Sequence, residues 1–378
     1  MDTKIKVGVR VRPLNTKEIE SSSVSVIDCE RDKFVLTKPP AKKSCFEYDW
    51  TFDSASTSRS VYESSCRPLI ENIFEGFNAT FFAYGQTSSG KTHTLGGSDM
   101  NEGVIPFALE DIFERSRELH ANGTKVEIEL SYIEIYREEC FDLLSAEDRK
   151  VRLDLKETNT GKTVLDGISV HPVQDITAVM QHLRNGAKIR STGQTAMNAH
   201  SSRSHSICTL NLRIVRATTG AVTSQLHLVD LAGSERAKKT QATGEAFQEG
   251  ISINRGLLAL GNVVSALATR SMRNTAAAGS SEANSHIHVP YRESKLTRLL
   301  KDSLGGNGMT VMLACVSPAD CNVEETLNTL RFASRASAIV NSARVNHSVG
   351  DSTDTVALLR EVVELREKLS LLQSSQYG

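Results

Sequence analysis

The order of apolar and polar residues predicts alternating strands and helices along most of the chain. Residues 5–11 place aliphatic side chains on one face of an extended strand, and residues 125–136 alternate in the same way. The predicted strands are 5–11, 46–52, 79–84, 125–136, 207–215, 222–231 and 309–316, and the predicted helices are 58–77, 104–120, 175–190, 251–268 and 323–340. This interleaving predicts one large α/β domain whose central sheet is covered by helices, and not a set of separate modules.

Three segments stand apart from this pattern. Residues 269–288 are rich in Ser, Ala and Asn, which predicts an exposed loop, and residues 341–353 are polar and patternless, like a linker. Beyond the linker, one core position of a seven-residue repeat holds Thr355, Val362 and Leu369, and the other holds Leu358, Leu365 and Leu372. The repeat predicts a helix over residues 354–373, either in a short coiled coil or packed on its own domain. We therefore expect a main domain over residues 1–340, then the linker and this helix.

Composition narrows the classes of protein. The chain has 378 residues, of which 39% are hydrophobic, and its 44 Lys and Arg nearly balance 45 Asp and Glu, for a net charge of −1. This balance excludes a uniformly basic nucleic-acid binder. No apolar run is long enough for a transmembrane helix or a secretory signal, so no membrane partner is expected. Seven cysteines without a CxxC pair argue against a disulfide framework or a zinc site and favour a reducing compartment.

The clearest chemical motif is a phosphate-binding loop. It follows the predicted strand 79–84 and matches the pattern GxxxxGK[ST] in full, with the residues Gly85, Gln86, Thr87, Ser88, Ser89, Gly90, Lys91 and Thr92. Glycines let the backbone N–H groups point at phosphate oxygens, and Lys91 would contact the β- and γ-phosphates. The Thr92 hydroxyl would be a ligand of Mg²⁺.

Two further polar motifs fit a nucleotide site. Asp230 ends the predicted strand 222–231 and could reach the Mg²⁺ shell through water, while the N–H of Gly233 could meet a γ-phosphate. Residues 198–205 combine three serines, an amide and an arginine, which suits a loop that closes over a nucleotide. Arg203 is predicted to pair with Glu235 when the γ-phosphate is present. The guanine-specific NKxD motif is missing from the sequence, which favours ATP over GTP.

Together these motifs resemble the kinesin motor domain, and the resemblance covers about residues 5–346. Residues 10–13 (Arg-Val-Arg-Pro), 253–262 and 289–300 also resemble segments of that family. The helix that contains residues 253–262 and the segment 314–330 look most like chromokinesins, the fourth subfamily. The resemblance implies a single P-loop NTPase domain of kinesin type, with a mixed central sheet flanked by helices. It also implies Mg-ATP hydrolysis coupled to microtubule binding.

The resemblance assigns roles to individual residues of these motifs. The residues that would frame the adenine are Arg10, Arg12, Pro13 and His93. The residues that would hold Mg²⁺ are Thr92, Ser202 and, through water, Asp230. The residues that would order the hydrolytic water or sense the γ-phosphate are Asn198, Ser201, Ser202, Arg203, Gly233 and Glu235.

The charges are unevenly distributed. Residues 236–301 contain ten Lys and Arg against four acids, a net charge of +6, so the rest of the chain carries −7. Because tubulin is acidic, this region predicts microtubule binding that weakens with salt. The alternative is that these cations only lie on the solvated faces of helices and bind no partner. The contacts that we expect are Lys238, Lys239, Arg255, Arg273, Arg292, Lys295 and Arg298.

The linker is the expected coupling element. In kinesins with an N-terminal motor it docks on the core when ATP binds, and movement is usually toward the plus end. Only four residues precede Ile5, and residues 337–340 lack the lysines common in the family; both departures predict weak docking. The leading interpretation is a plus-end-directed microtubule motor in the cytoplasm or on the spindle, which dimerises through a longer C-terminal coiled coil. The alternatives are a non-motile, nucleotide-switched regulator of microtubule dynamics and a P-loop switch protein outside the kinesins.

Overall fold

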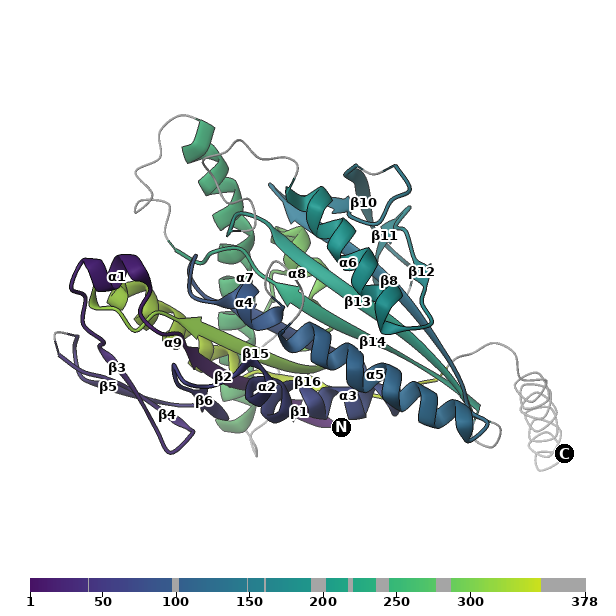
Figure 1. Cartoon of the computed structure of the whole chain (residues 1–378), viewed down its shortest axis with the longest axis horizontal. Coiled ribbons are helices and arrows are strands. Elements are labelled where there is room, and N and C mark those ends of the chain that lie inside the picture. The colour runs from purple at the N-terminus through teal and green to yellow at the C-terminus, as the bar shows by residue number, and fades with distance from the viewer. Residues whose placement is uncertain are drawn as a thin grey trace, which may run out of the picture.

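A mixed central sheet runs through the molecule with helices on both faces (Figure 1). The computed structural model describes residues 1–39, 41–96, 102–147, 149–159, 161–191, 202–216, 220–235, 245–276 and 287–347. From edge to edge, the main path of the sheet is β11 (Thr163–Asp166), β10 (Val151–Glu157), β9 (Glu139–Asp142), β8 (Lys125–Tyr136), β13 (His205–Arg216), β14 (Gly220–Asp230), β7 (Ala79–Tyr84), β15 (Met309–Val316), β2 (Lys6–Val11) and β6 (Trp50–Phe52). Two short strands lie off this path, β12 (His171–Pro172) on β8 and β17 (Asn346–His347) on β14.

The strand directions explain the sequence patterns. From β14 through β7, β15 and β2 to β6, each strand is parallel to the next, whereas β8, β13 and β14 form an antiparallel meander. Seven of the eight residues of β15 are buried, as expected for a parallel strand that is covered on both faces. β8 alternates at its start because that part of the sheet is covered on one face only.

Two groups of helices form two apolar cores on opposite faces of the sheet (Figure 1). One core contains α3 (Arg67–Phe74), α5 (Val104–Ala121) and α6 (Ile176–Ser191), and the other contains α7 (Glu245–Ala276), α8 (Lys295–Leu299) and α9 (Val323–Ala336). The remaining helical segments are α1 (Thr16–Glu20), α2 (Ser58–Val61), the π-helix Tyr62–Cys66, α4 (Lys91–Leu95) and the 3₁₀ turns Tyr291–Glu293 and Asp320–Asn322. None of the described helices is both long and apolar enough to cross a bilayer.

Two small sheets complete the fold. One contains β3 (Ile27–Glu30), β4 (Phe34–Thr37) and β5 (Ser44–Glu47). The other pairs β1 (Asp2–Lys4) with β16 (Val340–Ser342), so the first residues of the linker form a strand on the N-terminal residues. The expected strand 46–52 is therefore wrong as one element: β5 and β6 belong to different sheets, and the buried Tyr48 between them donates its hydroxyl to the Leu330 carbonyl at 2.8 Å.

The predicted helices are confirmed with changed ends. The helix expected over 58–77 contains a π-helical turn and ends at Phe74. α7 extends to Ala276, so residues 269–276 are helical and not a loop, in line with the high helix propensity of alanine, methionine and arginine. α9 ends at Ala336, which leaves Val340 to start β16. The rest of the expected loop up to residue 286, the end of the linker and the heptad helix lie outside the described residues.

Candidate functional site

The topology brings the three polar motifs to one edge of the sheet. The phosphate-binding loop follows β7, and Asp230 ends the adjacent parallel strand β14, so both lie where carboxyl ends of parallel strands meet. β13 runs antiparallel to β14, and Ser206 near its start faces Asp230. The loop that precedes β13 therefore enters the same edge. This convergence follows from strand order and direction alone.

The phosphate-binding loop is built on a close backbone approach. A Cβ at Gly85 would lie 2.1 Å from the Cys315 carbonyl oxygen, and φ is +150°, so only glycine fits there. Lys91 is 6% exposed and donates from Nζ to the carbonyls of Gly85 and Gln86, both at 2.8 Å. Burial lowers the pKa of Lys91. An ammonium held in such a site favours an anionic ligand nearby, because the charge is otherwise costly to bury.

Thr92 and Asp230 form a pair of oxygen donors that fits a hard cation. The Thr92 hydroxyl donates to Oδ2 of Asp230 at 2.9 Å. The other oxygen of Asp230, Oδ1, is buried and has no hydrogen-bond partner among the described residues. Mg²⁺ prefers oxygen ligands and usually keeps several waters, so a hydroxyl and a carboxylate beside a phosphate loop suit it.

The second switch motif contacts the phosphate-binding loop directly. Glu235 accepts hydrogen bonds from the Thr87 N–H at 2.8 Å and from the Thr87 hydroxyl. The Gly233 N–H, which we expected to meet a γ-phosphate, donates to the Ser202 carbonyl at 2.9 Å in this structure. The contact of Glu235 with Thr87 differs from the expected pair with Arg203, which stays a prediction for the γ-phosphate-bound state. A Cβ at Gly233 would lie 2.3 Å from side-chain oxygens of both Glu235 and Thr87, so a larger residue here would displace this contact.

Sequence reasoning missed Arg190, which joins both switch regions from α6. Its side chain is 9% exposed and donates to the Ser204 hydroxyl, the Ser204 carbonyl and the Ser206 hydroxyl at 3.0–3.1 Å. It also lies 3.7 Å from Asp230 and 3.6 Å from Glu134, whose side chain is fully buried. An arginine at the end of an amphipathic helix carries no motif, because its partners come from three different strands.

His205 is a second residue whose role was not predicted. Its Nδ1 accepts a hydrogen bond from the Ala232 N–H at 3.0 Å, which links the start of β13 to the second switch motif. Burial, with the charges of Arg190 and Lys91, lowers the pKa of His205 to about 3. The imidazole is therefore neutral at pH 7 and can act as the acceptor of this bond.

The residues expected around the adenine divide into two kinds. Arg10 donates to the Thr94 hydroxyl at 2.8 Å and to the Ser56 carbonyl at 3.1 Å, so it fixes the walls of this region. Arg12 forms a two-point ion pair with Glu18 at 2.6 Å, and also donates to the Ser88 carbonyl and the Ser317 hydroxyl. Pro13 and His93 are exposed. Of the four, these last two are the ones left open to a ligand.

The described cations expected to bind microtubules lie on two packed helical segments. Arg255 and Arg273 are exposed on α7, and Arg292 is 84% exposed in the turn before α8. Lys295 and Arg298 are half-buried on α8. The remaining residues expected at the candidate sites, Asn198, Ser201, Lys238 and Lys239, lie outside the described residues.

A polar contact also joins α7 to the turn that precedes α8. The Asn262 amide of α7 donates to Glu293 at 3.2 Å, which holds the turn that carries Arg292 against α7. Leu258 on α7 is 66% exposed. An exposed leucine near several cations is typical of a protein-binding surface, where apolar contact adds to charge attraction.

Comparison with known proteins decides the family. The family model of the kinesin motor domain matches residues 10–339. The chain belongs to the kinesin motor domain family. The expected fold, with a mixed sheet flanked by helices and a phosphate-binding loop, is confirmed by this match and by the structural neighbours of this kinesin.

Similar kinesins come from several branches of the family. The chain is 40% identical over 395 residues to Kinesin-like protein KIF27 of Mus musculus, and covers 98% of itself and 27% of that protein. It is 43% identical over 360 residues to the Chromosome-associated kinesin KIF4 of Xenopus laevis, and covers 90% of itself and 27% of that protein. The expected likeness to chromokinesins is thus confirmed. The chain spans less than a third of the length of either relative.

A solved structure agrees over nearly the whole chain. The KIF14[391-772] dimer in its two-heads-bound state, with AMP-PNP and in complex with a microtubule, is 36% identical with a TM-score of 0.84. The match covers 96% of this chain and all of that chain. This protein thus has the structure of a kinesin motor domain, and that class of domain binds nucleotide.

Proposed function

We propose that this kinesin is a microtubule-stimulated ATPase that converts Mg-ATP hydrolysis into plus-end-directed movement along microtubules. The observation that carries the proposal is that the linker strand β16 pairs with β1 while Glu235 contacts Thr87. The nucleotide loop, the second switch and the linker are thus all in contact with one core. A change at the γ-phosphate can be transmitted to the linker only if such contacts exist.

In the proposed catalytic cycle, the chain's own groups position the phosphates and the water. Residues 85–92 hold the phosphates through backbone N–H groups and Lys91, and Pro13 with His93 lies beside the base. Asn198, Ser201, Arg203 and Glu235 orient the hydrolytic water, and Gly233 responds to the γ-phosphate. Mg²⁺, when bound by Thr92, Ser202 and water on Asp230, would neutralise charge on the β- and γ-phosphate oxygens.

The proposed track contact is electrostatic and apolar. The exposed Arg255 and Arg273 lie on α7 and the exposed Arg292 lies in the turn before α8. Lys295 and Arg298 lie on α8 itself. Lys238 and Lys239 extend the same positively charged region of the sequence. Binding to an acidic microtubule would then weaken as salt rises. We place the protein on microtubules in the cytoplasm, including the spindle.

The proposed division of the chain is a motor domain at 1–340, a linker at 341–353 and a neck helix at 354–373. β16 forms on β1 although few residues precede Ile5, and β17 adds a second pairing on β14. These pairings favour a linker that docks. The full protein is proposed to dimerise through a longer coiled coil.

A gliding assay on polarity-marked microtubules tests the proposal, because surface-bound motors move filaments even as monomers. We expect plus-end-directed motility together with microtubule-stimulated ATP turnover, and neither in a Glu235→Ala control. Static binding with stimulated turnover would contradict the motor and would favour the non-motile regulator of microtubule dynamics. Turnover that microtubules leave unchanged would contradict both.

A further inference from the structure

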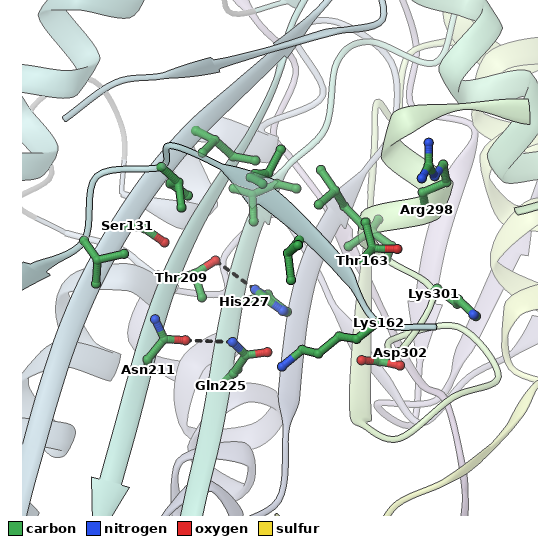
Figure 2. A pocket seen from close by; sticks show the side chains of 18 of the residues that line it. Ser131, Lys162, Thr163, Thr209, Asn211, Gln225, His227, Arg298, Lys301 and Asp302 are labelled. Atoms are coloured by element: carbon green, nitrogen blue, oxygen red, sulfur yellow. Dashed lines mark hydrogen bonds between the residues drawn. The ribbon is translucent and has the colours of Figure 1, made fainter. Parts of the chain in front are cut away.

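A cavity of about 370 Å³ lies on the face of the sheet that α8 covers (Figure 2). Its floor comes from β8, β13 and β14, and its walls come from β11 with the segment after it and from α8 with residues 300–302. None of its lining residues belongs to the nucleotide motifs. Its volume falls in the range of about 300–1,000 Å³ that is typical of small-molecule sites.

One end of the cavity is apolar. Ile133 and Ile207 face each other across β8 and β13 on the floor. Leu165 and Ile168 come from the β11 side, and Leu299 comes from α8. Five branched aliphatic side chains around one space suit a flat hydrocarbon group, because burying it removes apolar area from water.

The other end has a polar floor made of two cross-strand pairs. His227 faces Thr209, with its Nδ1 2.9 Å from the Thr209 hydroxyl. One step along the strands, Gln225 faces Asn211 and donates to its carbonyl oxygen at 2.8 Å (Figure 2). Each pair uses only part of its hydrogen-bonding capacity. Nε2 of His227, Nδ2 of Asn211 and Oε1 of Gln225 have no partner in the described part of the chain.

The charges around this floor favour an anion. Burial and the charge of Lys162 lower the pKa of His227 to about 4, so this imidazole is neutral at pH 7. Lys162 directly precedes β11, and its side chain extends across the floor toward Gln225 (Figure 2). It forms no ion pair with any described residue. On the rim, two positively charged residues, Arg298 and Lys301, stand against one negatively charged residue, Asp302.

We propose that this cavity binds a small aromatic carboxylate. Its ring would lie against Ile133, Ile207 and Leu299, and its carboxylate would approach Lys162. The Asn211 amide and the neutral imidazole of His227 would offer hydrogen bonds to the carboxylate. The site is separate from the nucleotide and requires no ATP turnover, so it stands whether or not the protein is a motor.

The test is a titration of the whole chain with naphthalene-2-carboxylate. The methyl NMR signals of Ile133, Ile207 and Leu299 are recorded at each ligand concentration. For a ligand of this size we expect a dissociation constant on the order of 1 mM. Naphthalene-2-carboxamide, which has the same shape without the charge, should bind at least about fivefold more weakly. Shifts confined to other methyl groups, or equal binding of the amide, would overturn the proposal.

Two variants locate the contact. Lys162→Met should weaken binding about fivefold, while the control Lys156→Met should change it less than about twofold, because Lys156 pairs with Asp166 on the same hairpin and does not line the cavity. Thr209→Leu fills the floor and should abolish the shifts. The thermal unfolding midpoint of Thr209→Leu shows whether this variant folds. If it does not fold, the affinity of Lys162→Met alone tests the site. Equal affinities of the two lysine variants would count against the site.

Discussion

The Thr87 N–H and hydroxyl both donate to the carboxylate of Glu235, although the two residues are 148 positions apart in the sequence. One residue belongs to the phosphate-binding loop and the other to the second switch motif. Ser234 beside it donates its N–H to the Gly85 carbonyl at 3.1 Å. The position of the second switch is therefore coupled to the loop that would hold the phosphates.

We expect Glu235→Ala to lower microtubule-stimulated ATP turnover by about 100-fold or more, with little change in ATP affinity. The reason is that Glu235 is proposed to act on the hydrolytic water and on the switch position, and not on the ground-state phosphates. Turnover with and without microtubules, beside fluorescent-nucleotide binding, measures this. Thr87→Ser keeps a hydroxyl and should stay near wild type, while Thr87→Val should lose part of the activity. A fully active Glu235→Ala protein would contradict the assignment.

Arg190 makes a prediction about stability. Replacing it with Met leaves the buried carboxylates of Glu134 and Asp230 with less compensation, so the free energy of unfolding should fall by about 3–5 kcal/mol. Urea denaturation measures the change. The control is Arg213→Met, because Arg213 and Glu127 are 31% and 39% exposed and such pairs contribute about 0–1 kcal/mol.

A double variant separates charge from packing at this position. Arg190→Met together with Glu134→Met removes one of the carboxylates that Arg190 compensates, although Glu134 also pairs with Lys150 at 2.6 Å, and should recover part of the lost stability. If the single variant Arg190→Met costs no more than Arg213→Met, the network of Arg190 does not stabilise the fold as argued.

The pair of Arg12 and Glu18 predicts a dependence on pH. Hydrogen bonds from Arg12 lower the pKa of Glu18 from 4.5 to about 2 in the folded protein. The stabilisation is present above pH 4.5 and is lost as the pH falls toward about 2, because the unfolded chain takes up the proton first. Glu18→Gln should therefore be less stable than wild type at pH 7, and the gap should narrow at pH 3. Denaturant unfolding at both values checks this, with the exposed Glu20→Gln on the same helix as the control.

Asn346 makes a prediction about the linker. Its side-chain amide donates to the Gly76 carbonyl at 2.9 Å and to Asn78 at 3.1 Å, and its carbonyl accepts from Asn307 at 2.8 Å. We expect Asn346→Ala to reduce the docked population about tenfold, which corresponds to roughly 1.4 kcal/mol. Hydrogen exchange of residues 340–347 and gliding speed should both report it. The exposed neighbour His347 offers the matched variant His347→Ala, which keeps the backbone pairing and should behave like wild type.

The long elements could be predicted from sequence because burial leaves a periodic apolar pattern. β15 and β8 have the predicted bounds, and α5 differs from its prediction by one residue. β16 could not be predicted, since backbone hydrogen bonds and the amide of Asn341 hold it. Such contacts leave no repeat in the sequence.

The residues of the candidate site also divide into those that could be predicted from the sequence and those that could not. The spacing of Gly85, Gly90, Lys91 and Thr92 could be recognised because the phosphate loop is local in sequence. Arg190 could not, because its role depends on strands that the fold brings together. The bond between Glu235 and Thr87 was missed for the same reason, although each residue lies in a recognised motif.

The order of the linker strands has a mechanical consequence. β17 pairs with β14 at two positions, and β16 pairs with β1 at three. A force that pulls the chain beyond His347 away from the sheet would load β17 before β16. The bonds of a short antiparallel pair that is peeled from its end open one after another, so little force is needed at each step. Tension would therefore detach the linker in two stages while the central sheet stays intact, and the contacts of Asn346 would set the force at which the first stage begins.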